Sequence, residues 1–93
     1  MREVQYYENR QRKIEGTYSN NKRTGKWTAW FKNGKIWSEG AFKDGLSEGL
    51  RTVYYENGRK HIVGSYKRDE KIGKWQFYSA DGMLLKEIDF DQK

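Results

Sequence analysis

The chain is a succession of short apolar segments separated by polar, glycine-rich ones, with no long stretch of helical periodicity. Three segments, 27–31, 52–56 and 75–78, are rich in the aromatic and β-branched residues that favour strands. Asn-Gly or Asp-Gly follows each of them, at 33–34, 57–58 and 81–82. These dipeptides between strand-like runs are the strongest short signal for a β-hairpin. The pattern therefore predicts consecutive β-hairpins.

The same residue types recur every 24 positions. One aromatic column contains Tyr18, Phe42, Tyr66 and Phe90, and a second contains Tyr6, Trp30, Tyr54 and Tyr78. Glycines repeat with the same period at 16, 40 and 64 and at 25, 49 and 73. A repeat of this length is typical of arrays in which each unit stacks on the next. We expect a single domain, residues 1–93, with a partial copy at 1–14, full copies at 15–38, 39–62 and 63–86, and a truncated copy at 87–93.

Two-residue type I′ turns at the Asn-Gly positions would set the register of each hairpin. For the hairpin centred on 33–34, the expected pairs are Lys32–Lys35, Phe31–Ile36, Trp30–Trp37 and Trp27–Gly40. The last pair suits a large ring lying over a residue without a side chain. Arg10 tolerates a positive φ poorly, so the first hairpin is expected to be the weakest or to use another turn. Segments 43–50 and 67–74 are interpreted as connections between hairpins.

Alternation of side chains along the strands divides this register into two faces. The expected packing face carries Trp27, Ala29, Phe31, Ile36 and Phe42. The opposite, wetter face is expected to carry Thr28, Trp30, Lys32, Lys35, Trp37 and Glu39, with His61 opposite Tyr54 in the next copy. A β-bulge would exchange the faces locally.

Composition supports a thin, folded sheet. The chain has 93 residues, a formal net charge of +6, 34% apolar and 16% aromatic residues. The aromatic content argues against disorder, and a domain of this size buries only about 60–65% of its unfolded surface. There is no cysteine, so disulfides are excluded. No signal sequence or membrane span is recognised, and cytoplasm is the default location.

The residues do not suggest catalysis, and we expect neither a cofactor nor a bound metal. The only histidine is His61, and metal sites need several ligands at defined spacing. Asp89 and Asp91 are interpreted as charges that protect a sheet edge. The glycines match no phosphate-binding loop and the serines match no nucleophile motif.

Three segments carry a family resemblance: EGTYSNNKRTGKWTAWFKNG, EGAFKDGLSEGLRTVYYENG and VGSYKRDEKIGKWQFYSADG. They resemble the MORN repeat, and most closely the bacterial YwqK-type antitoxin version of it. The resemblance implies an all-β fold: an elongated, single-layer, twisted antiparallel sheet of consecutive hairpins. It also implies binding, and for the YwqK type the neutralisation of a toxin by direct contact. The chain departs from the pattern at Arg51, Val63 and Ile88.

Rings on both faces of one layer would leave apolar area exposed, and such area usually marks an interaction surface. We therefore expect a protein-binding module, with a toxin as one partner that the resemblance suggests. The candidate partner-binding residues are Tyr6, Trp30, Trp37, Tyr54, Tyr78, Lys32, Lys35, Arg59, Lys60 and Lys74.

Two alternatives stay open. Basic residues concentrate in 1–26 and 51–74, with 7 basic against 3 acidic residues in each, and could bind anionic lipid. The unpaired edges at 3–8 and 84–91 could add a strand from a second copy. Nucleic acid is not an expected partner, because no known nucleic-acid-binding signature is present.

Overall fold

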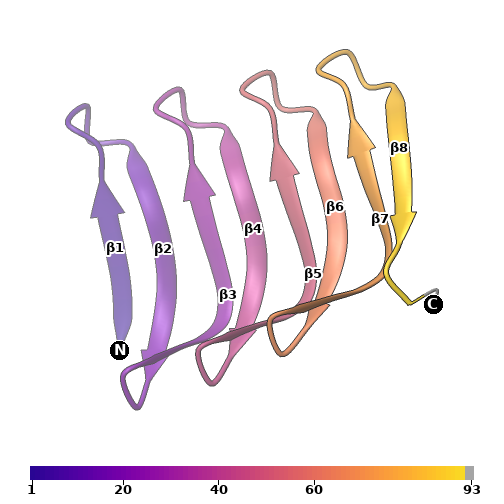
Figure 1. The fold of residues 1–93 in the computed structure, drawn as a ribbon. Helices are drawn as coiled ribbons and strands as arrows, with labels where there is room; N and C mark the ends of the chain where they lie inside the picture. The colour runs from indigo at the N-terminus through magenta and orange to yellow at the C-terminus, as the bar shows by residue number, and fades with distance from the viewer. Residues whose placement is uncertain (92–93) are drawn as a thin grey trace.

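The computed structural model describes residues 1–91 as one open sheet of eight antiparallel strands in chain order (Figure 1). The strands are β1 (Arg2–Tyr6), β2 (Arg12–Ser19), β3 (Lys22–Trp30), β4 (Ile36–Lys43), β5 (Leu46–Tyr54), β6 (Lys60–Lys67), β7 (Glu70–Tyr78) and β8 (Leu84–Asp89). The expected all-β sheet of consecutive hairpins is confirmed. Segments 43–50 and 67–74, interpreted above as connections, lie mostly within β5 and β7. Residues 92–93 of the expected copy 87–93 lie outside the described part of the chain.

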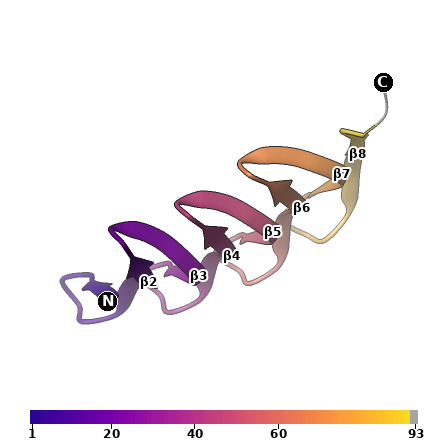
Figure 2. The same cartoon turned by 90° about the horizontal axis from the view of Figure 1, so that it is seen from below.

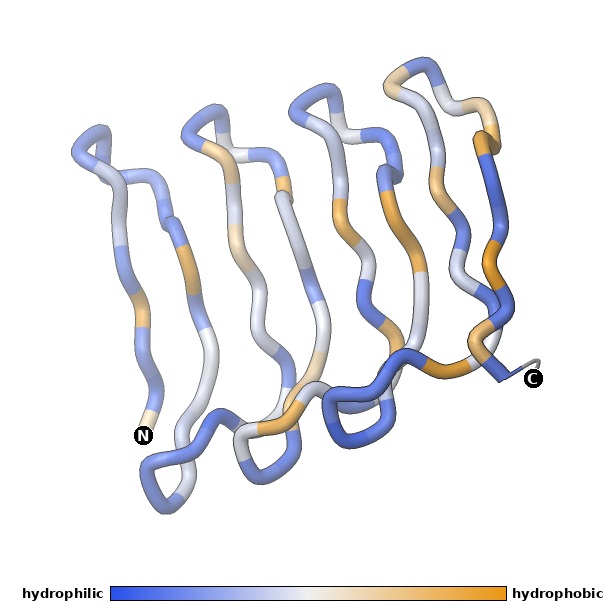
Figure 3. Tube along the Cα trace, in the orientation of Figure 1, coloured by the Kyte–Doolittle hydropathy of each residue, from blue (hydrophilic) through white to orange (hydrophobic). Residues whose placement is uncertain are grey.

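The sheet is one layer thick. Its extents are 40 × 33 × 12 Å, and within residues 1–91 no second layer covers either face (Figure 2). Each strand makes its extensive contacts only with strands next to it in the chain. Hydrophilic residues gather in the turns at both ends of the strands (Figure 3). Among residues 1–91, Trp27, Ala29 and Trp75 are the buried apolar side chains, so aromatic rings lying flat on the sheet replace a conventional core.

The Asn-Gly turns are not of type I′. In the β3–β4 hairpin the amide of Gly34 donates to the carbonyl of Phe31, and the amide of Phe31 donates to Lys35. Gly34 has φ of 88°, whereas Asn33 is not in the left-handed region. This is a three-residue loop, a type I turn followed by one left-handed residue. The first hairpin makes the same two hydrogen bonds with Arg10 at φ 70°, so it does not use a turn different from the others; that it is the weakest hairpin stays a prediction.

Type I′ turns occur at the opposite ends of the strands. Both residues have positive φ in Asn20-Asn21, Asp44-Gly45 and Arg68-Asp69, which join β2 to β3, β4 to β5 and β6 to β7. Asn, Asp and Gly are the residues that tolerate this conformation best, and Arg68 is the exception. The two kinds of turn therefore alternate along the ribbon.

Each three-residue loop shifts the register by one residue next to the turn, and a bulge in the following strand shifts it back. Trp30 pairs with Ile36 and Ala29 pairs with Ser38, which leaves Trp37 as the extra residue. The expected pairs Trp30–Trp37 and Phe31–Ile36 are therefore wrong, whereas Trp27–Gly40 is confirmed. The same shift leaves one extra residue in every later or earlier hairpin: Lys13, His61 and Leu85.

Asparagine side chains connect successive turns. The Oδ1 of Asn33 accepts from the amide of Lys35, 2.9 Å away, and its Nδ2 donates to the carbonyl of Glu56 in the next turn at 3.2 Å. Asn9 and Asn57 make the equivalent pairs of hydrogen bonds. The role that these asparagines share along the ribbon is therefore to bridge neighbouring turns.

Candidate functional site

Two groups of aromatic rings in edge-to-face contact lie in a row on the face that carries Trp27, Ala29, Ser38 and Val53, called here the Trp27 face. The ring of Trp27 lies edge-on between Tyr18 and Phe42, with centroid distances of 5.2 and 6.2 Å. Trp75 lies in the same way between Tyr66 and Phe90, at 5.0 and 6.0 Å. Each such pair adds stability beyond the area it buries.

Glycines in the preceding strand make room for the two indoles. A Cβ atom on Gly16 would lie 2.0 Å from the ring of Trp27, and one on Gly64 would lie 2.0 Å from the ring of Trp75. The indole Nε1 of Trp27 also donates to the carbonyl of Thr17 at 3.1 Å. The ring of Trp27 therefore covers Gly16 of β2. It does not cover Gly40, the residue with which Trp27 pairs and over which the ring was expected to lie.

Arg51 occupies the equivalent place in the middle of the row. Its guanidinium lies over Gly40, where a Cβ atom would be 2.8 Å from Cζ, and 5.1 Å from the centre of the Phe42 ring. It donates one hydrogen bond to the Ser38 Oγ at 3.2 Å. A flat cation has thus replaced the indole, and because it fills less space than the indole the row is hollowed beside it.

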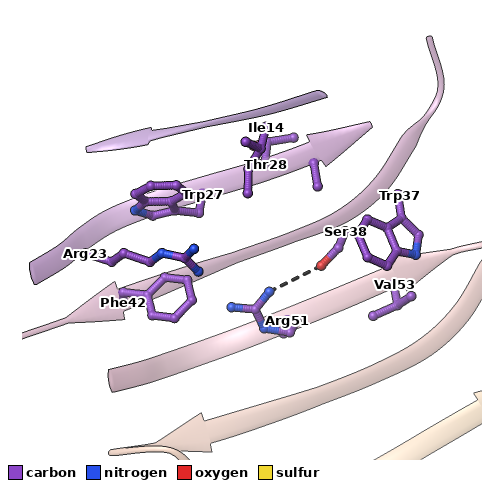
Figure 4. Close-up of a pocket in the computed structure, with 10 residues that line it drawn as sticks. Ile14, Arg23, Trp27, Thr28, Trp37, Ser38, Phe42, Arg51 and Val53 are labelled. Atoms are coloured by element: carbon purple, nitrogen blue, oxygen red, sulfur yellow. Dashed lines mark hydrogen bonds between the residues drawn. The ribbon is translucent and has the colours of Figure 1, made fainter. Parts of the chain in front are cut away.

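This hollow is a groove of about 200 Å³ on the Trp27 face (Figure 4). β2, β3, β4 and β5 line it through Ile14, Arg23, Trp27, Thr28, Ala29, Trp37, Ser38, Phe42, Arg51 and Val53. Figure 4 shows Trp37 and Val53 at one end and Arg23 at the other, with Arg51 between them. We call it the Arg51 groove. It combines an apolar end with a basic end.

Trp37 forms the apolar end of the groove. As the bulge residue of β4, it lies on the Trp27 face, 6.3 Å from the ring of Phe31, and 49% of it is exposed. Its expected position on the wetter face, and that of Ile36 on the packing face, are wrong, because Ile36 pairs with Trp30. The bulge has exchanged the two side chains.

The basic end of the groove holds two guanidinium groups and no carboxylate. Cζ of Arg23 lies 4.6 Å from the centre of the Trp27 ring and 5.4 Å from that of Phe42, and Arg51 contacts the same Phe42 ring. Neither arginine forms an ion pair within residues 1–91. The groove is therefore positively charged and electrostatically unmatched.

The opposite face, called here the Trp30 face, holds the second aromatic column. Several of its side chains have partners within the sheet. The guanidinium of Arg12 covers the ring of Trp30 at 4.5 Å. The hydroxyl of Tyr54 donates to Glu39 at 3.0 Å, and burial together with that carboxylate raises the pKa of Tyr54. Trp30, Tyr54 and Tyr78 are half-buried, whereas Tyr6, at the edge, is 60% exposed. The inner rings of this face are thus covered or hydrogen-bonded, whereas Leu50 and Leu84 on the same face are exposed.

The structure does not gather the ten candidate binding residues into one surface. Trp37 lies on the Trp27 face, whereas Tyr6, Trp30, Tyr54, Tyr78, Lys60 and Lys74 belong to the Trp30 face. Lys32, Lys35 and Arg59 lie in the turns at one edge. Lys35 and Arg59 already donate to carbonyls of the next turn, those of Asn57 and Asp81.

Sequence reasoning missed Arg23, Arg51, Val53 and Ile14 as members of a groove. Arg51 was visible as a departure from the tryptophan found at positions 27 and 75 of the repeat. The signal was therefore present, but the one-residue shift next to the three-residue turn hid that Trp37 shares the face of Arg51.

His61 does not lie where the repeat pattern placed it. His61 is a bulge residue that stacks on Tyr55 at 4.1 Å, and it does not face Tyr54 as expected, since Tyr54 pairs with Lys60. In residues 1–91 no group of three or more potential metal ligands comes together. That same part of the chain has no helix long and apolar enough to cross a membrane.

The sequence pattern of the MORN repeat variant matches residues 23–44, 47–68 and 71–92. The chain belongs to the MORN repeat variant family. Each match starts within or beside β3, β5 or β7 and covers one hairpin closed by a three-residue loop. Comparison with curated proteins and with solved structures gives no significant match. MORN repeat proteins are generally non-catalytic modules that bind proteins or membranes.

Proposed function

We propose that this MORN repeat chain is a protein-binding module whose contact surface is the Arg51 groove. The observation that carries the proposal is the half-exposed Trp37 beside Phe31, on the face where the packing row is interrupted. Tryptophan and arginine are the residues most enriched at the energetic centres of protein interfaces. A groove that joins both, with an open apolar end, fits a partner side chain.

The Trp30 face supports this choice by contrast. Trp30 is covered by Arg12, and the hydroxyl groups of Tyr54 and Tyr78 are bonded within the sheet to Glu39 and Gln76. A partner would have to displace these contacts before it reached the rings. The Trp27 face offers Trp37 without such a cost.

Toxin neutralisation is the finer form of this proposal. It rests on the resemblance to the YwqK-type repeat and on the presence of a binding groove, and the partner would then be a toxic enzyme blocked by direct contact. Its specific test is whether co-expression of this chain rescues growth of cells that express a candidate toxin.

Anionic membranes are a second candidate, favoured by the exposed lysines and arginines in the turns. Lys35 and Arg59, however, bond to neighbouring turns, and Glu56 and Asp81 lie among them. Such an edge is mixed in charge, so we favour the protein partner. Sedimentation with acidic vesicles at low salt would overturn that preference if the chain bound them.

The experiment for the proposal compares the two faces. A photo-crosslinking amino acid is placed at position 53, which lines the groove beside Trp37, or at position 30, and each protein is illuminated in an extract of the source cells. We expect one discrete adduct from position 53 that is absent from position 30. Adducts of equal yield from both positions, or none from position 53, would contradict it. Circular dichroism of each variant controls for folding.

A further inference from the structure

The charge of the Arg51 groove specifies its ligand further than the proposed function does. Arg23 and Arg51 both contact the ring of Phe42, with Cζ 5.4 and 5.1 Å from its centre. Two like charges that contact one ring repel each other, and an anion beside them lowers that repulsion. No carboxylate of residues 1–91 takes that place.

Arg51 keeps most of its hydrogen-bonding capacity for a ligand. A guanidinium has five N–H donors, and Arg51 uses one of them on the Ser38 Oγ. Its planar fork matches the two oxygens of a carboxylate. The ring of Phe42 and the backbone of Gly40 flank the guanidinium on two sides, so the fork lies beside the groove.

The apolar end lies next to this cation on the same face. Trp37, Val53 and Ile14 line it together with Arg51, and the whole groove measures about 200 Å³. A free inorganic anion would leave those side chains uncovered. A long anionic polymer would meet only two arginines in the groove. The lining therefore suits a short amphipathic segment.

We propose that the Arg51 groove recognises a protein segment in which an Asp or Glu side chain lies beside a large apolar side chain. The carboxylate pairs with Arg51 and Arg23, and the apolar side chain packs on Trp37 and Val53. This inference rests on the proposed function and adds the chemistry of the partner to it. Because Trp27 and Trp75 fill the corresponding slots of the other copies, the middle copy alone provides this site.

The test is selection from a random peptide library displayed on phage, with the purified chain as bait. Three baits are compared: the unaltered chain, Trp37→Ala and Arg51→Trp. Arg51→Trp is the matched control for folding, because it restores the tryptophan found at 27 and 75 over a glycine. Selected peptides are resynthesised with amidated C-termini, so that only side-chain carboxylates remain.

We expect the unaltered chain to enrich peptides with an acidic residue beside Leu, Phe or Trp. Changing that acid to its amide should weaken binding about tenfold or more to the unaltered chain, and have no effect on binding to Arg51→Trp. Enrichment of apolar peptides without an acid would overturn the inference and leave the binding function in place. The same peptides enriched equally by Trp37→Ala would overturn the groove as the contact surface.

Discussion

Trp30 and Trp37 belong to one hairpin but lie on opposite faces of the sheet. Trp30 pairs with Ile36, and Trp37 is the bulge residue that follows. The two rings therefore differ in environment: Arg12 covers Trp30, whereas 49% of Trp37 is exposed. Substitutions at the two positions should separate stability from binding.

The first prediction concerns this pair. Trp30→Ala should lower the free energy of unfolding by about 2 kcal/mol, because a half-buried ring and its contact with Arg12 are lost. Trp37→Ala should lower it by less than about 1 kcal/mol and abolish binding through the groove. Urea unfolding and the crosslinking assay measure the two effects. Equal loss of stability in both variants would contradict the separation of faces.

Gly16→Ala should be among the most destabilising small substitutions in the chain. The added methyl would lie 2.0 Å from the indole of Trp27, which is held by Tyr18 and Phe42. We expect a loss of about 3 kcal/mol, at the upper end of overpacking effects. Thermal and urea unfolding measure it.

Gly40→Ala is the matched control for that substitution. Its methyl would meet the end of the Arg51 side chain, which can move, so the loss should stay below about 1 kcal/mol. In the Arg51→Trp background the same Gly40→Ala change should become as costly as Gly16→Ala. Additive effects of the two changes would show that the ring does not enter the slot.

Tyr54 should make stability depend on pH in the alkaline range. Burial and the neighbouring Glu39 raise its pKa above the ordinary value of 10.0, so the folded protein holds that proton more tightly than the unfolded chain. This contribution is complete below pH 10 and is lost as pH rises through the pKa of the folded state. Urea unfolding between about pH 8 and pH 11 should therefore show a steeper fall for the unaltered chain than for Tyr54→Phe. Parallel curves would refute the assignment.

Phe31→Tyr should stabilise the sheet. Tyr7 and Tyr55, one repeat before and after it, donate from their hydroxyls to the carbonyls of Trp30 and Tyr78, each at 2.7 Å. Phe31 lacks that hydroxyl, and a tyrosine there would reach the carbonyl of Tyr54. We expect a gain of about 1 kcal/mol. The reverse control, Tyr55→Phe, should cost a similar amount in the same unfolding assay.

Addition of a second copy to β8 should be disfavoured by two side chains. Ile88 lies where earlier strands carry Gly16, Gly40 and Gly64, and Glu3 of β1 lies where β3 carries Trp27. A ring from an added strand thus has no slot, and β1 offers no ring. Light scattering should show a monomer at high concentration, whereas the double variant Ile88→Gly with Glu3→Trp should associate. A concentration-dependent oligomer of the unaltered chain, broken by charge substitutions in β8, would contradict this.

The fold could be predicted because several columns of the repeat recur at the same spacing along the chain. Aromatic and glycine columns at a constant spacing locate every strand pair, whatever the detail of the turns. The site could not be predicted to the same degree, because one hydrogen bond decides it. Once the amide of Gly34 bonds to Phe31, each loop gains a residue and Trp37 moves to the other face. Asn-Gly is compatible with both loops, so composition alone could not choose between them.

Since no strand depends on a partner remote in the sequence, length in this molecule is an adjustable quantity. Duplication of one unit within the gene would extend the ribbon by two strands and leave every existing neighbour in place. Copies would then be free to diverge singly, as the exchange of an indole for a guanidinium at position 51 illustrates. Each hairpin of such a sheet can in this way acquire its own binding residues without a change in the fold.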